Sequence, residues 1–188
     1  MTDRQLLRED VLEHARLVVT AGADEIRAAC TALGGHVDVL EADLGDEAAV
    51  AAEAAALSAV SMLVCDAGAI MRGRPGALDG LSASVDGAWN ATRALANAVF
   101  IPSGYGKVVL IAPRPGDGEH AGAARAALDN LARTTSIEWA RHGVRVVAVL
   151  PGDATPPSAV AQLVAFLASP AGDYFSGCAL ELGAVASS

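Results

Sequence analysis

The chain has 188 residues, a formal net charge of −9 and a hydrophobic content of 53%. A chain of this length and composition can bury a sizeable core within one soluble domain. The negative charge argues against binding to nucleic acid or to anionic membrane surfaces. No apolar run is long enough to cross a bilayer, and the charged start lacks the character of a signal peptide. We therefore expect a cytoplasmic protein with no nucleic-acid or membrane partner.

The potential metal ligands are dispersed along the chain. The cysteines are Cys30, Cys65 and Cys178, and the histidines are His14, His36, His120 and His142. Their spacing fits neither a disulfide framework nor a metal site. The sequence thus predicts reduced thiols and no bound metal.

Short aliphatic and β-branched runs alternate along the chain with alanine-rich segments of helical composition. The runs expected to form strands cover residues 16–20, 37–41, 61–65, 107–112, 144–150 and 179–182. The segments expected to form helices cover residues 23–33, 46–58, 82–99, 121–141 and 158–168. This alternation predicts an α/β fold, a doubly wound parallel sheet of about six strands with helices on both faces. No linker divides the chain, so residues 1–188 are expected to form one domain.

An extra helix is expected at the start of the chain, within residues 1–14. Leu6, Leu7, Val11 and Leu12 would share one face of a helix over residues 3–14.

The most specific motifs lie between residues 106 and 152. They are GKVVLIAP at 106–113, AGAARAALDNLARTTSIEWA at 121–140 and GVRVVAVLPG at 143–152. These runs resemble the fifth strand, the following helix and the sixth strand of the short-chain dehydrogenase/reductase (SDR) family. Residues 164–170 and 174–177 are similar to the family's last helix and last strand. The resemblance implies a Rossmann-like sheet with the strand order 2-1-3-4-5-6.

The resemblance also locates the family's four catalytic positions. The family uses a tyrosine as general acid/base, a lysine that lowers its pKa, a serine that polarises the carbonyl and an asparagine that holds a relay water. The corresponding positions here hold Ala121, Arg125, Pro113 and Ser84. Alanine has no titratable group and proline no hydroxyl, so neither proton transfer nor carbonyl polarisation is available. The resemblance therefore implies the family's scaffold without its catalytic site.

The cofactor motif is altered as well. After its first strand the family carries Thr-Gly-x-x-x-Gly-x-Gly, whereas this chain reads TAGADEIR at 20–27, with Ala21, Glu25 and Arg27 in place of the glycines. Those glycines let the backbone approach the cofactor's pyrophosphate. The carboxylate of Glu25 would repel that group, although Arg27 could offset part of the repulsion. We expect neither NAD nor NADP to bind in the usual way.

Vestiges of a cofactor site remain at Thr20, Gly22, Asp43, Leu44 and Gly68. Asp43 and Leu44 resemble the pair that contacts adenine in the family, but a strand-end turn before the helix at 46–58 explains Asp43 without a ligand. Gly68 ends a CDAG run that resembles the family's Asn-Asn-Ala-Gly, and a tight turn would explain it equally without a ligand.

Two segments are short for the family. A strand-helix unit is missing from the first half, and the opening strand could be the family's first or its second; the position of Thr20 favours the first. Only about ten residues separate Gly152 from Leu163, where the family places its substrate-binding helices. Such a remnant cannot form a lid that excludes water.

Two helices carry apolar residues that suggest association. In 82–99 these residues surround the helix, and in 121–141 a large apolar stripe is accompanied by a stripe of small side chains. Since the family pairs these helices between subunits, we expect a contact that involves Trp89, Ala127, Leu128, Leu131 and Trp139.

Three functions remain open. The first is a non-catalytic structural or regulatory subunit, in a homo-oligomer or beside an intact SDR paralogue. The second is an active NAD- or NADP-dependent oxidoreductase acting on a hydroxy or oxo compound, with His120 and Arg125 as rewired catalytic groups. The third is a binding module for a nucleotide or acyl group.

Overall fold

The computed structural model describes residues 7–74 and 76–183. The strands are β1 (Arg16–Thr20), β2 (His36–Leu40), β3 (Met62–Asp66), β4 (Gly106–Ile111), β5 (Val144–Pro151) and β6 (Cys178–Leu182). The helices are α1 (Asp24–Ala32), α2 (Glu47–Ala56), α3 (Ala67–Arg72), α4 (Ala77–Leu95), α5 (Ile101–Ser103), α6 (Ala121–Trp139) and α7 (Pro157–Ala168). All neighbouring strands pair in parallel, in the order β2-β1-β3-β4-β5-β6. The predicted fold class and strand order are confirmed.

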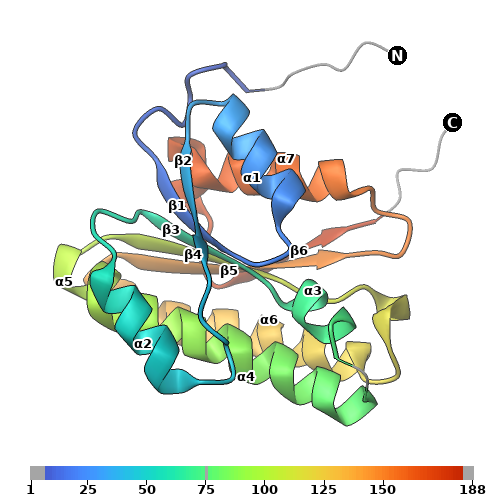
Figure 1. Ribbon diagram of the computed structural model, residues 1–188. Helices are drawn as coiled ribbons and strands as arrows, with labels where there is room; N and C mark the ends of the chain where they lie inside the picture. The colour runs from blue at the N-terminus through green and yellow to red at the C-terminus, as the bar shows by residue number, and fades with distance from the viewer. Residues whose placement is uncertain (1–6, 75, 184–188) are drawn as a thin grey trace, which may run out of the picture.

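The sheet separates two helical layers (Figure 1). Helices α1 and α7 cover one face, and α2, α4 and α6 cover the other. Each face has its own apolar core, because side chains alternate between the faces of a strand. In β1, for example, Val18 packs toward α4 and α6, whereas Leu17 and Val19 pack toward α1 and α7. Parallel strands that are covered on both faces explain the continuous apolar runs in the sequence.

The long helix after β3 differs from its predicted bounds of 82–99. Helix α4 begins at Ala77, and a π-helical turn at Ala96–Phe100 joins it to α5. Pro102 lies in α5 and has no N–H to donate to the preceding turn, which is compatible with such a distortion.

The prediction of an extra N-terminal helix is wrong for residues 7–14, the part of this segment that the structure describes. Residues 9–14 form consecutive turns, and residues 1–6 lie outside the described residues. The N–H of Leu12 donates to the carbonyl of Leu33 across the chain, and the Leu12 side chain is buried. The apolar spacing that suggested a helix therefore serves to insert Leu12 beside α1.

Candidate functional site

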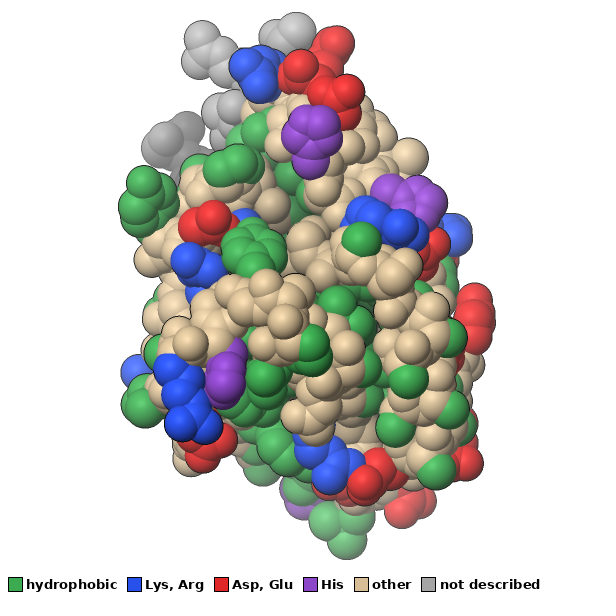
Figure 2. Space-filling view, turned by 90° about the vertical axis from the view of Figure 1, so that its left-hand side faces the viewer, with side chains coloured by type: hydrophobic (Ala, Val, Ile, Leu, Met, Phe, Trp, Pro, Cys, Tyr) green, Lys and Arg blue, Asp and Glu red, His purple; other side chains and the backbone are tan. Residues whose placement is uncertain are grey.

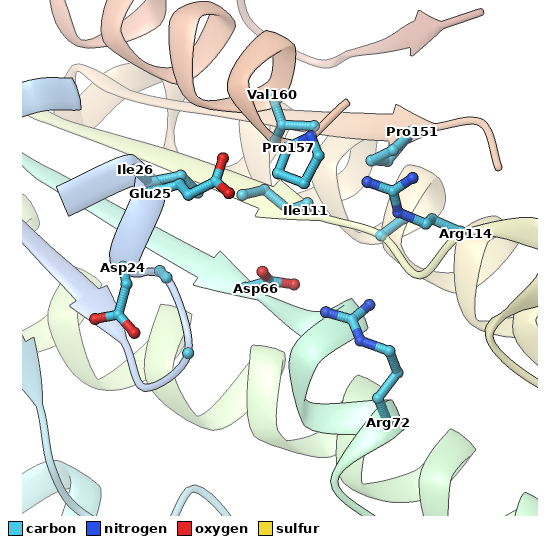
Figure 3. A pocket seen from close by; sticks show the side chains of 13 residues that line it. Asp24, Glu25, Ile26, Asp66, Arg72, Ile111, Arg114, Pro151, Pro157 and Val160 are labelled. Atoms are coloured by element: carbon cyan, nitrogen blue, oxygen red, sulfur yellow. The ribbon is translucent and has the colours of Figure 1, made fainter. Parts of the chain in front are cut away.

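A pocket of about 260 Å³ opens at the carboxyl edge of the sheet. It lies among the start of α1, the ends of β3 and β4, helix α3 and the start of α7, as Figure 3 shows. Ligands of doubly wound folds bind at this edge, which makes the pocket the candidate site.

The start of α1 supplies one wall. Gly22 has a φ of +86°, and a Cβ there would lie 3.2 Å from the Cβ of Ala69, so both conformation and space favour glycine. The carboxylate of Glu25 points across Ile111 toward Pro157, whereas that of Asp24 points away (Figure 3). Arg27 Nη2 lies 2.9 Å from Asp24 Oδ1, and Arg27 does not line the pocket. The expectation that Arg27 offsets the charge of Glu25 at the site is therefore wrong.

The floor of the pocket is Asp66, at the end of β3. Its Oδ1 accepts a 2.8 Å hydrogen bond from the N–H of Ala69 and so caps α3. Its own N–H donates to Thr20 Oγ1 at 3.0 Å, which commits the buried Thr20 hydroxyl to the scaffold. Burial raises the pKa of the Asp66 carboxyl above its ordinary value, although the Ala69 hydrogen bond and the charge of Arg72 act in the opposite direction.

The other wall is basic. Arg72 and Arg114 line the pocket opposite Glu25 (Figure 3). Arg72 Nη1 lies 2.8 Å from Asp117 Oδ2, which also accepts a hydrogen bond from the N–H of Arg114 at 2.8 Å. Arg114 Nη1 donates to the carbonyl of Asp153 at 2.9 Å. These contacts join α3 to the loops that follow β4 and β5.

None of the four positions of the family's catalytic residues lines this pocket. Ala121 is fully buried and packs with Met71 and Ala124. Ser84 is also fully buried, and its Oγ has no hydrogen-bond partner among the described residues. Pro113 is buried behind α3.

Arg125 has a clear structural partner at each of two strand ends. Its Nη1 donates to the carbonyl of Pro113 and to that of Pro151, both at 2.7 Å. The guanidinium thereby ties the segment after β4 to the end of β5. His120 is the half-buried residue before α6, makes no side-chain capping hydrogen bond and does not line the pocket.

The remaining vestigial positions serve local structure. Asp43 Oδ1 accepts a hydrogen bond from the N–H of Gly45 at 3.0 Å, as the interpretation of a strand-end turn requires. The carbonyl of Leu44 accepts a hydrogen bond from Asn90 of α4 at 2.9 Å. Gly68 lies in the first turn of α3, so the expected tight turn is wrong. A Cβ at Gly68 would lie 3.1 Å from the Cα of Pro113, and this close approach explains the glycine.

The residues proposed for a subunit contact differ in exposure. Trp89 is 36% exposed, Ala127, Leu131 and Trp139 are half-buried, and Leu128 is fully buried in the core beneath α6. Leu128 therefore lies behind the outer surface of α6, and any contact there would involve it only indirectly. The apolar residues around α4 do meet other elements besides the sheet, but these are α2, α3 and α6 of the same chain, so this pattern alone does not require a second subunit.

Burial raises the pKa of the Cys30 and Cys65 thiols to about 12. Neither thiol is therefore ionised near neutral pH. The parts of the chain that the structure describes hold no group of three or more side chains that could bind a metal ion. None of the described helices is both long and apolar enough to span a membrane.

Sequence reasoning missed the three charged residues that shape the pocket, Asp66, Arg72 and Arg114. A signal for Asp66 existed, since a carboxylate directly after an apolar strand run lies at the ligand-binding edge of a parallel sheet. The two arginines carry no comparable signal, because long-range contacts bring them there.

The chain matches no protein-family model. It is 30% identical to the galactitol 2-dehydrogenase (L-tagatose-forming) of Cereibacter sphaeroides, over 95% of this chain and 87% of that protein. The aligned span of 223 positions exceeds the 188 residues of this chain, so the relative contains segments that this chain lacks.

Solved structures give the same picture of the fold. A citronellol catabolism dehydrogenase of Pseudomonas aeruginosa superposes with a TM-score of 0.77 and 24% identity, over 97% of this chain and 99% of the other. A gluconate 5-dehydrogenase of Burkholderia cenocepacia, solved with NADP and tartrate, gives a TM-score of 0.75 and 18% identity, over 93% and 96% of the two chains.

Proposed function

The chain belongs to the short-chain dehydrogenase/reductase superfamily, and we propose that it is a non-catalytic member that serves as a structural or regulatory subunit. The proposal rests on the residues at the family's tyrosine and lysine positions. The tyrosine position holds Ala121, which is fully buried, and the lysine position holds Arg125, whose guanidinium binds two main-chain carbonyls. A general acid/base must reach its substrate, and neither of these side chains can.

The same geometry argues against the rewired oxidoreductase. That alternative needs His120 and Arg125 to face a substrate, but both residues lie outside the pocket lining. Arg125 would also have to leave Pro113 and Pro151, at the cost of two charge-assisted hydrogen bonds. Oxidation of a hydroxy compound, the activity in the name of the Cereibacter relative, is therefore the weaker alternative for this chain.

We infer further that the site does not accept NAD or NADP. In a Rossmann-like fold the pyrophosphate lies against the start of the first helix, where main-chain N–H groups and the helix dipole favour an anion. Here the first turn of α1 carries Asp24 and Glu25, and Glu25 points into the pocket. Both the charge and the missing glycines disfavour a dinucleotide.

The proposed contact between subunits uses the outer face of α6 together with Trp89 of α4. Ala123, Ala126 and Asn130 are exposed there, and Ile137 is 77% exposed. Small side chains let a second helix approach closely, and an exposed isoleucine and tryptophan gain from being covered. The partner would be a second copy of this chain or an intact SDR paralogue.

Sedimentation velocity tests the subunit proposal, on the chain alone and mixed with an intact SDR paralogue from the same cell. We expect a complex under at least one condition. Ala126→Glu should dissociate it, because the contact would bury an unpaired carboxylate. This exposed position is preferable to the half-buried Ala127, where a glutamate would also disturb packing within the chain.

Ala51→Glu, at an exposed position on α2, is the matched control and should leave the complex intact. A wild-type chain that stays monomeric alone and in the mixture would overturn the subunit proposal.

A further inference from the structure

The pocket at the carboxyl edge has two walls of opposite charge. Glu25 and the floor residue Asp66 form its acidic side, and Arg72 and Arg114 form its basic side opposite Glu25 (Figure 3). The four residues come from α1, β3, α3 and the loop after β4, so no single helix end or acidic run creates the arrangement.

In the part of the chain that the structure describes, no cationic side chain forms an ion pair with the acidic side. Among the described residues, neither Glu25 nor Asp66 forms an ion pair within 4 Å, whereas the neighbouring Asp24 is paired with Arg27. Burial also disfavours the charged form of the Asp66 side chain, because it raises the pKa of this carboxyl. A buried carboxylate that has no ion-pair partner pays a desolvation cost, and a positively charged ligand would offset this cost.

On the basic side, several N–H donors of the two arginines make no hydrogen bond to the described residues. A guanidinium carries five N–H donors. The hydrogen bonds that hold Arg72 and Arg114 in place use only Nη1 of each, within the described residues. Both side chains are fixed by these bonds, so their other donors can bind an anion with little further ordering.

The volume of the pocket and the number of its carboxylates limit the classes of ligand that it can bind. The pocket volume of about 260 Å³ lies below the range of about 300–1,000 Å³ that is usual for drug-sized ligands. Two carboxylates are fewer than the six to eight oxygen ligands that Ca²⁺ takes. The pocket thus suits a small charged organic molecule better than a metal ion or a dinucleotide.

We propose that this pocket binds a small organic zwitterion, with its ammonium group on the side of Glu25 and Asp66 and its anionic group toward Arg72 and Arg114. The inference rests on the proposed loss of dinucleotide binding, because both ligands would occupy the start of α1. It gives the non-catalytic protein a ligand that could be sensed without being converted.

Thermal shift and isothermal titration of the full chain test this proposal with three matched probes. The probes are 5-aminovalerate, which carries both charges, pentylamine, which carries only the cation, and pentanoate, which carries only the anion. We expect 5-aminovalerate to stabilise the protein most, and pentylamine more than pentanoate, because a ligand that binds only the folded state raises its stability.

Two variants separate the pocket from general charge effects. Asp66→Asn keeps a residue that caps α3 comparably, and Glu25→Gln keeps the shape of an exposed side chain. Each should weaken 5-aminovalerate binding by on the order of tenfold, as expected when a hydrogen bond to a charged group is lost. Glu138→Gln, an exposed position on α6 at the other face of the sheet, should leave binding unchanged.

The proposal is overturned if 5-aminovalerate fails to bind at 20 mM, or if Asp66→Asn and Glu25→Gln bind it as well as wild type does. A parallel titration with NAD and NADP keeps the two ideas apart. Dinucleotide binding would contradict the proposed function, whether or not the zwitterion binds.

Discussion

The two edges of the sheet treat buried charge in opposite ways. At the amino edge, Lys107 is 5% exposed, and its Nζ lies 2.6 Å from Asp173 Oδ1 and donates to the carbonyls of Leu167 and Ser169 at 3.0 and 2.7 Å. At the carboxyl edge, Asp66 accepts a capping hydrogen bond from Ala69 and, among residues 7–74 and 76–183, forms no ion pair. The chain itself neutralises the first charge and leaves the second facing a pocket.

The surface around Lys107 suggests that the charged residues at the amino edge of the sheet stabilise the fold. Figure 2 views the amino ends of the strands, where acidic and basic side chains are dispersed over the surface. A second pocket of about 400 Å³ lies there beside Tyr105 and Asp173, but the Tyr105 hydroxyl donates to Asp173 Oδ1, which also pairs with Lys107. The comparison indicates that the charges of the amino edge hold the fold together and that those of the carboxyl edge are available to a ligand.

The variant Lys107→Met gives the strongest test of the structural role that the comparison assigns to the amino edge. The change leaves Asp173 and several carbonyls without their shared donor, and the loss of one partner of a buried pair costs about 3 kcal/mol. For a chain of this size, that loss lowers Tm by about 6–12 °C. Differential scanning calorimetry measures it. Arg133→Met is the control, because this exposed arginine pairs with Asp129 on its own helix and, within the described residues, with no other acidic side chain. A similar Tm for both variants would contradict the structural role of Lys107.

Arg125→Met tests the tie between β4 and β5. Two carbonyls lose a charged donor, and we expect the free energy of unfolding to fall by about 2 kcal/mol. Urea denaturation measures the change, and Arg125→Lys should recover part of it because one ammonium can still reach a carbonyl. If Arg125 instead faced a substrate, its replacement would leave stability nearly unchanged.

Restoring the family's residues should not restore its chemistry. In Ala121→Tyr with Arg125→Lys, the tyrosine has to enter the space that Met71 and Ala124 fill, and overpacking of this kind costs about 1–3 kcal/mol. We expect a destabilised protein with no NAD- or NADP-dependent alcohol oxidation in a spectrophotometric assay. Turnover by the double variant would mean that the cofactor and substrate positions are intact. Turnover by the wild type that His120→Ala abolishes would instead support the rewired oxidoreductase.

The smallest expected effect concerns Asp66 and pH. A carboxyl whose folded-state pKa is raised contributes stability below its unfolded pKa and loses that contribution as pH rises through the folded value. Asp66→Asn should therefore raise Tm at pH 7, by about 2–4 °C for each kcal/mol gained, with a smaller gain near pH 4. Thermal unfolding between pH 4 and 8 measures this trend. A variant that is less stable than wild type at pH 7 would show that the carboxylate is needed by the fold itself.

The elements could be predicted because their signals are local. Aliphatic runs such as Val144–Leu150, with alanine-rich segments between them, fix both strand positions and the parallel arrangement. The errors arise where one pattern suits two structures. The spacing around Leu12 fits a helix as well as a turn that buries one leucine, and the run ending at Gly68 fits a turn as well as the first turn of α3.

The site could be predicted only in part. The replacement of the family's tyrosine and serine by Ala121 and Pro113 is a matter of residue identity, so the sequence suffices to predict it. The partners of Arg125 and Lys107 are main-chain carbonyls brought together by the fold, and carbonyls leave no trace in a sequence. The opposite charges of the pocket were missed for the same reason, since Arg72 and Arg114 reach it through contacts with Asp117 and Asp153.

Isothermal titration of the wild-type chain with NAD and with NADP, each at millimolar concentration, tests the central claim most directly. The account predicts no heat of binding and no change in Tm, because Glu25 points into the pocket where the pyrophosphate would lie and the glycines of the motif are absent. Saturable binding of either dinucleotide with a matching rise in Tm would contradict the claim that this member of the superfamily has lost its cofactor site.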